Sequence, residues 1–257
     1  MKYKHITYRV AAVSAGMGLM LSGASAALAF SPSDYALFGG ATYASPGEAS
    51  NRAVKLVSDA STTHSGIDYG LGTTTTTFAD IESLATSYKF DAGTCGGGSP
   101  RFQVNVASTS GDTGNIFVYI GPAPSYTGCP VGVWTSSGEL IGTTPVDTSQ
   151  LDGGTFYDPY ATALAKYGEY EVTGIQLVAD GGWAMPLTGQ VVNVDNTMIN
   201  DTVYTYEVPT PTSKEACMKG GWRTMGDANG TMFKNQGDCV SYAATGGENT
   251  AATSTTP

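Results

Sequence analysis

The sequence has little charge, few basic residues and almost no histidine. Of its 257 residues, 13% are charged and two are histidine, while 41% are hydrophobic. That hydrophobic fraction is ample for a core and argues against disorder, which requires low hydrophobicity together with high charge. Twelve basic residues against 22 acidic ones give a net charge of −10 without a basic cluster. The chain is therefore a poor partner for nucleic acid or anionic lipid.

The scarcity of histidine excludes most catalytic and metal sites. His5 stands near the N-terminus, and His64 lies in the loop sequence Ser-Thr-Thr-His-Ser-Gly with no nucleophile motif beside it. A Ser-His-Asp or Cys-His arrangement would need His64 as its base. Zinc and iron sites that rely on histidine fail for the same reason. We therefore expect no catalytic residues of these kinds.

The sequence also lacks an apolar run long enough to be read as a membrane span. A basic head is followed by an apolar stretch over residues 10–21, shorter than the ~20 residues that a span needs. With the small residues of Ala27-Leu28-Ala29 after it, this pattern predicts a secretory signal peptide over residues 1–29. Its loss removes three basic residues and leaves nine against 22 acidic ones, a net charge of −13. The prediction is a secreted, extracellular protein without membrane insertion.

Only four cysteines are present, Cys95, Cys129, Cys217 and Cys239. In an exported protein they indicate two disulfides, and no Cys-x-x-Cys pair favours a metal instead. Three pairings are open. Two predicted strands between Cys95 and Cys129 form a hairpin whose open ends adjoin these cysteines, so the spacing favours pairing of neighbours. We expect Cys95–Cys129 and Cys217–Cys239, with no free thiol.

Short segments rich in Val, Ile, Thr, Tyr and Phe, bounded by Gly, Pro, Asp or Asn, dominate the chain up to residue 208. The predicted strands are residues 52–58, 84–90, 101–107, 115–120, 170–179, 190–200 and 203–208. Only residues 160–167 have a helical pattern, with Gly168 as the stop. Many short strands with little helix predict an all-β fold, a two-sheet jelly-roll-like β-sandwich.

The composition changes at the sequence Pro-Thr-Pro-Thr, which predicts an extended linker. Beyond it, Ser213 and Asn235 are placed to cap two helices, and a hairpin turning at Asn229-Gly230 is the alternative. We favour the paired helices. The predicted divisions are a signal peptide (1–29), a β-sandwich domain (30–208), a Pro/Thr linker (209–212), a small disulfide-closed module (213–247) and a disordered tail (248–257).

Two parts of the sequence resemble uncharacterised secreted bacterial proteins. Cys217 and the following Gly-Gly-Trp, with Phe-Lys-Asn-Gln-Gly-Asp-Cys ending at Cys239, resemble their C-terminal motif. The sequences CGGGSPRF (95–102), IQLV (175–178) and Gly182-Trp183 resemble the domain that precedes it. That domain is similar to the jelly-roll sandwiches of carbohydrate-binding modules and laminin-G-like lectins. Residues 191–196 (VVNVDN) resemble the closing strand of those modules. The resemblance implies a sandwich and transfers no functional residues.

Aromatic side chains are the leading candidates for ligand binding. Trp183, Tyr157 and Tyr160 lie among glycine-rich loops, and Asp180 lies close to the tryptophan in sequence. Aromatic faces stack on the CH-rich faces of sugars, and a carboxylate can hydrogen-bond their hydroxyl groups. We predict these four residues as ligand-binding; the alternative for Trp183 is that it plugs one end of the sandwich.

Carboxylates leave two further chemistries open. Glu169 and Glu171 are two apart on a predicted strand and share a face, so they could form the carboxylate pair of a glycoside hydrolase. A solvated sheet face is the simpler interpretation. No cofactor is expected, although loop aspartates permit a structural calcium ion: Asp147, Asp152, Asp158, Asp180 and Asp195.

Three functions compete on these observations. We favour a non-catalytic extracellular binding protein whose partner is a glycan or a surface protein. A neutral glycan is expected, because the acidic surface repels anionic polymers. The first alternative is a structural or cell-surface interaction protein without a small ligand. The second is a glycan-active hydrolase that uses a carboxylate pair.

Overall fold

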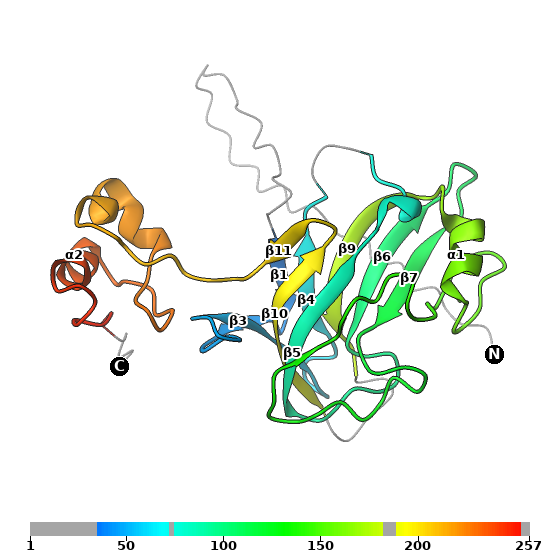
Figure 1. The fold of residues 1–257 in the computed structure, drawn as a ribbon, viewed down its shortest axis with the longest axis horizontal. Coiled ribbons are helices and arrows are strands. Elements are labelled where there is room, and N and C mark those ends of the chain that lie inside the picture. Colours follow the sequence, from blue (N-terminus) through cyan, green and yellow to red (C-terminus); the bar gives the residue numbers. More distant parts are fainter. Residues whose placement is uncertain (1–34, 72–74, 182–188, 253–257) are drawn as a thin grey trace, which may run out of the picture.

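The computed structural model describes residues 35–71, 75–181 and 189–252. Two antiparallel sheets pack face to face and enclose one hydrophobic core (Figure 1). The all-β two-sheet sandwich predicted from the sequence is confirmed. The predicted signal peptide and Trp183 lie outside the described residues.

The five-stranded sheet has the strand order β1-β4-β9-β6-β7, and the six-stranded sheet has the order β2-β3-β10-β5-β8 with β11 paired to β10. The first sheet comprises β1 (Tyr35–Gly39), β4 (Ser65–Tyr69), β9 (Glu171–Ala179), β6 (Arg101–Ala107) and β7 (Thr113–Tyr119). The second comprises β2 (Thr42–Ala44), β3 (Ala53–Ser58), β10 (Gln190–Ile199), β5 (Leu84–Ala92), β8 (Thr135–Ser136) and β11 (Thr202–Tyr204). All seven predicted strands are present, although the last ends at Tyr204 and not at residue 208.

The alternation of side chains along each strand separates a core face from an outer face. On β6, Phe102, Val104 and Val106 are buried in the core, while the residues between them point to the other side of the sheet. Burying one such side chain contributes roughly 1.5–3 kcal/mol, so the alternating pattern fixes which face of each sheet turns outward.

Residues after β11 remain attached to the sandwich. The buried hydroxyl group of Tyr206 lies 2.6 Å from that of Tyr69 and donates to Thr197 over 2.9 Å. The amide of Asn51 donates to the carbonyl of Val208 over 2.9 Å, and the Val208 N–H donates back to Asn51 over 3.1 Å. The chain is therefore anchored up to the start of the predicted linker.

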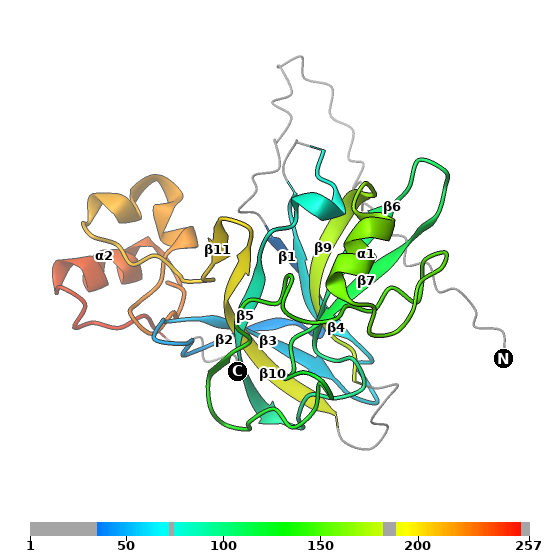
Figure 2. The ribbon, with the colours of Figure 1, turned by 45° about the vertical axis from the view of Figure 1, so that its right-hand side comes forward.

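Helices are few. Helix α1 (Tyr160–Tyr167) agrees with the prediction and ends at Gly168, and a short 3₁₀ turn, η1 (Phe78–Asp80), packs beside it. The C-terminal module contains η2 (Glu215–Thr224), which is kinked, and α2 (Gln236–Ala244), which Asn235 caps by accepting from Asp238 N–H. The module lies across the molecule from α1 in both views (Figures 1 and 2). No helix in the described ranges is both long and apolar enough to cross a membrane.

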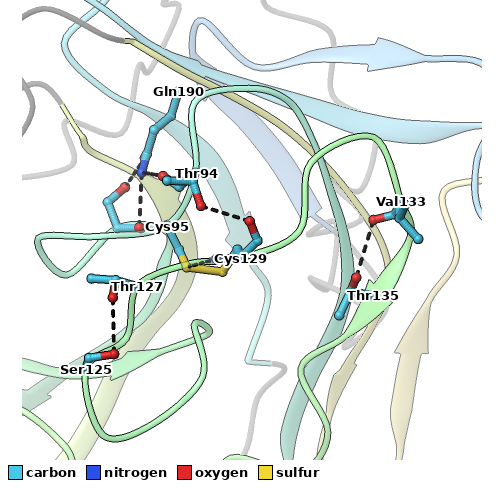
Figure 3. The surroundings of a disulfide bond; sticks show 9 residues. Thr94, Cys95, Ser125, Thr127, Cys129, Val133, Thr135 and Gln190 are labelled. Atoms are coloured by element: carbon cyan, nitrogen blue, oxygen red, sulfur yellow. Dashed lines mark hydrogen bonds between the residues drawn. A yellow bond between two sulfur atoms is a disulfide. The ribbon is translucent and has the colours of Figure 1, made fainter.

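Both predicted disulfides are present, Cys95–Cys129 and Cys217–Cys239. The first joins the segment before β6 to the loop after β7 (Figure 3). Around it, Gln190 donates to the carbonyl oxygens of Thr94 and Ser99, and the Thr94 hydroxyl donates to the carbonyl of Cys129. The loop that leaves Cys129 is thus tied to both sheets at one end of the sandwich.

Candidate functional site

The outer face of the five-stranded sheet carries a row of polar side chains that crosses four strands. The strand register aligns Asp68 of β4 with Gln176 of β9, Gln176 with Gln103 of β6, and Gln103 with Phe117 of β7. The amide of Gln103 donates to that of Gln176 over 3.1 Å. Both amides and the carboxyl group are partly exposed. This row offers acceptors and donors on a flat surface, ending at an aromatic ring.

Arg101 lies beside this polar row and contacts several of its neighbours. Its guanidinium group donates to Asp180 over 2.9 Å, to the Gly98 carbonyl over 2.9 Å and to Gln103 over 3.1 Å. It also lies over the ring of Phe117, 4.7 Å from the centroid, and is 8% exposed. Because its hydrogen-bonding groups are committed to the protein, Arg101 is suited to positioning Asp180 and Gln103, and not to binding an anion.

Three tyrosines continue this surface beyond the edge of β7. The rings of Tyr126 and Tyr157 are parallel, with centroids 5.7 Å apart, and Tyr119 meets both edge-on at 5.1 and 6.2 Å. Tyr119 and Tyr126 are buried, whereas Tyr157 is 53% exposed. One ring is therefore presented to solvent on a support of two buried rings.

The backbone around this tyrosine cluster (Tyr119, Tyr126 and Tyr157) is unusual. Tyr126 and Tyr157 have φ angles of +52° and +55°, in a region that bulky residues rarely adopt. Such conformations cost about 1–3 kcal/mol and persist when surrounding contacts impose them. Here the contacts include the Tyr119 hydroxyl, which donates to buried Asp147 over 2.5 Å, and the Tyr126 hydroxyl, which donates to the Pro145 carbonyl over 3.2 Å.

Burial shifts the pKa of two groups at this surface, Tyr119 and Asp68. It raises the pKa of Tyr119, and the hydrogen bond to Asp147 adds to the effect, so Tyr119 remains a neutral donor. Burial also raises the pKa of Asp68, while a hydrogen bond from Gln176 opposes the shift. The tyrosine cluster and the polar row together form a rigid surface whose groups suit hydrogen bonding to neutral hydroxyl groups.

Two of the four predicted ligand-binding residues lie at this surface. Asp180 and Tyr157 are linked through Arg101 and the rings of β7. Tyr160 lies elsewhere: it begins α1 and packs against Phe78, with ring centroids 5.9 Å apart, beside the main core. Trp183 is outside the described residues, so its role stays a prediction.

The sequence reasoning missed Arg101, Gln103 and Gln176. The alternation of β6 places Arg101 and Gln103 on the face opposite Phe102, which the sequence pattern already showed. The neighbours on that face depend on the strand order, which joins β6 to β9 across more than sixty residues of chain. No local signal in the sequence contains that information.

The candidate catalytic carboxylates are both exposed. Glu171 begins β9, and Glu169 precedes it at the end of the turn after α1. The better-buried carboxylates are engaged structurally: Asp158 accepts from Thr148 over 3.0 Å and from Lys166 over 2.8 Å. These contacts give no support to a paired acid and base.

The aspartates considered for calcium differ in their surroundings. Asp195 is fully buried and accepts from the Ser50 hydroxyl and from the backbone N–H groups of Glu48 and Asn196, each over 2.8 Å. Within the described ranges, no three His, Cys, Asp or Glu side chains are grouped to hold a metal ion. The structural calcium ion stays a prediction.

No protein-family model matches the sequence, and no curated protein is significantly similar to it. A solved structure of an exo-beta-agarase is similar with a TM-score of 0.32 and 13% sequence identity. The match covers 72% of this chain and 26% of that protein, so the chain spans about a quarter of its length. A TM-score this low establishes neither a shared fold nor a shared activity.

Proposed function

We propose that this chain is an exported, non-catalytic glycan-binding protein. The signal-peptide pattern and two disulfides support an extracellular location, since disulfides persist in oxidising compartments. The glycan is a neutral one, and it binds on the outer face of the five-stranded sheet.

The observation that carries this proposal is the exposed ring of Tyr157, held rigidly beside a row of amides and carboxylates. A stacking platform needs a fixed ring with one open face, and Tyr126 covers the other face of this ring. Asp180, Gln103 and Gln176 then supply partners for hydroxyl groups across a flat surface. Preorganised side chains lose little entropy on binding, which favours a weakly interacting ligand such as a sugar.

Glycan-array binding by the mature protein tests the proposal. With the best neutral ligand found, Tyr157→Ala should weaken binding at least about tenfold, equivalent to about 1.4 kcal/mol. Tyr157→Phe should bind almost as well as the wild type, because it keeps the ring. Tyr43→Ala is the matched control, since Tyr43 is 47% exposed and lies on β2 of the other sheet.

Two results would contradict the proposal. Binding that survives Tyr157→Ala in a normally folded protein would place the ligand elsewhere. Shortened glycan chains, with cleavage abolished by Glu169→Gln or Glu171→Gln, would replace binding by hydrolysis as the function.

A further inference from the structure

The outer face of the six-stranded sheet has a different chemical character. The register aligns Thr42 of β2 with Lys55 of β3, Lys55 with Asn193 of β10, and Asn193 with Lys89 of β5. Two lysines therefore flank one amide in a straight row across the sheet. Neighbouring strands are ~4.8 Å apart, so the two lysine backbones are separated by about 10 Å.

A tryptophan lies at the end of this row. The Lys89 ammonium group is 5.5 Å from the centroid of the half-buried Trp134 ring. It also lies 3.6 Å from Asp91, which accepts a hydrogen bond from Asn193 over 2.7 Å. The Lys89–Asp91 pair is partly exposed, with 25% of the Lys89 side chain and 43% of the Asp91 side chain accessible, and its N–O distance is long, so the pair contributes little to stability and leaves part of the ammonium group accessible to a ligand.

Lys55 differs from the paired bases of the sandwich. Arg101 and Lys166 each form an ion pair of 2.9 or 2.8 Å with an aspartate. Within the described part of the chain, no carboxylate lies within ion-pair distance of Lys55. Lys55 is partly exposed on this face, whereas Asn193 between the two lysines is 3% exposed, so the lysines and not the amide are the groups that can reach a ligand.

The loop that carries Trp134 is held in place. It leaves the disulfide at Cys129 and runs beside β5, where the Gly132 N–H donates to the Phe90 carbonyl over 2.8 Å. It then pairs with β5 as β8, directly after the tryptophan. The Trp134 ring is thus held at the end of the row formed by Lys55, Asn193 and Lys89, where it could stack on a sugar ring.

We infer that the lysine row (Lys55, Asn193 and Lys89) with Trp134 is a second binding site, for an acidic polysaccharide. The two ammonium groups match carboxylate or sulfate groups on successive sugars, and the ring stacks on one sugar. The site is independent of the neutral-glycan site on the opposite sheet. Charges more than about 10 Å away are largely screened at 0.1 M salt, so the overall negative charge acts weakly at this site. Asp91 lies within that distance of Lys89, and the exposed groups of the site are therefore two ammonium groups and one carboxylate.

Affinity electrophoresis of the folded protein tests the inference with three probes: polygalacturonate, its methyl ester and carrageenan. The wild type should be retarded by polygalacturonate if the site reads carboxylates, or by carrageenan if it reads sulfates, and not by the uncharged ester. Lys89→Gln, Lys55→Gln and Trp134→Ala should each raise the dissociation constant about tenfold. Lys234→Gln, which removes one charge from the C-terminal module, should leave the constant unchanged.

Several results would overturn the inference. They are retardation by neither acidic polymer, equal retardation by the ester, or an equal loss in Lys234→Gln. A loss of retardation in Tyr157→Ala would place the acidic polymer on the five-stranded sheet. These outcomes are distinct from failure of the neutral-glycan proposal, which depends on other probes and on Tyr157.

Discussion

The two outer faces of the sandwich are built from the same alternation of side chains and differ in charge and in how deeply their bases are buried. In the described part of the five-stranded sheet, Asp68, Asp180 and Glu171 outnumber the one base, Arg101, whose guanidinium group is buried and donates three hydrogen bonds within the protein. On the six-stranded sheet the bases are the two lysines of the lysine row, both partly exposed, and the acids are exposed Asp91 and buried Asp195.

This difference shows that net charge is a poor guide to individual surfaces. The excess of acid led us to expect repulsion of anionic polymers by the whole protein. Strand pairing gathers two of the few bases, Lys55 and Lys89, on one face, beside exposed Asp91 and buried Asp195. The two faces should therefore select ligands of different charge, and each prediction below tests one side of that comparison.

The largest effect should come from the Cys95–Cys129 disulfide, since it serves both faces. This disulfide joins the hairpin of β6 and β7, on the five-stranded sheet, to the start of the segment that carries Trp134 on the six-stranded sheet. Replacing both cysteines by serine should lower the free energy of unfolding by about 3–4 kcal/mol and weaken both kinds of binding. Urea denaturation and the two binding assays measure this.

The matched control is replacement of Cys217 and Cys239, which close the C-terminal module. That change should destabilise the module and leave both binding constants of the sandwich intact. If it weakened sugar binding as much as the first replacement, the binding surfaces would have to include the module.

A smaller effect on the free energy of unfolding is expected when a base is removed from either face, and it should be larger for the buried base than for the partly exposed one. Arg101→Met should cost about 2 kcal/mol, because it leaves Asp180 and the Gly98 carbonyl without their donor. Lys89→Met should cost less than about 1 kcal/mol, because its ion pair is long, at 3.6 Å, and partly exposed. Urea denaturation of the two variants side by side gives the difference; equal losses would show that burial of the base does not distinguish the two faces.

Much of the fold was predictable because its signals are local. The alternation of Phe102, Val104 and Val106 identified β6, and the positions of Cys95 and Cys129 outside the hairpin gave their pairing. The four strands missed, β1, β2, β4 and β8, are short, and β4 contains a glycine over which Phe38 lies. Their pairing comes from neighbours distant in sequence.

The candidate sites were only partly predictable for the same reason. Asp180 and Tyr157 were chosen by residue type, and the structure places them at one surface through Arg101, which local reasoning did not select. Lys55 and Lys89 lie on strands separated by more than twenty residues, and only the insertion of β10 between them creates the row. Strand order decides which side chains become neighbours, and sequence periodicity does not encode it.

The smallest expected effect is the titration of Asp68 on the five-stranded face. Burial raises the pKa of this carboxyl group in the folded state, so the folded protein holds its proton more tightly than the unfolded chain. Folding is therefore favoured at pH values below the unfolded pKa of about 3.9, and this contribution is lost as the pH rises through the higher folded value. Asp68→Asn should accordingly stabilise the protein at neutral pH by less than about 1 kcal/mol, since the group is partly solvated. Urea denaturation from pH 3 to pH 7 should show the two proteins converging at the acidic end, and a variant less stable than the wild type at pH 7 would mean that the Asp68 carboxylate stabilises the polar row.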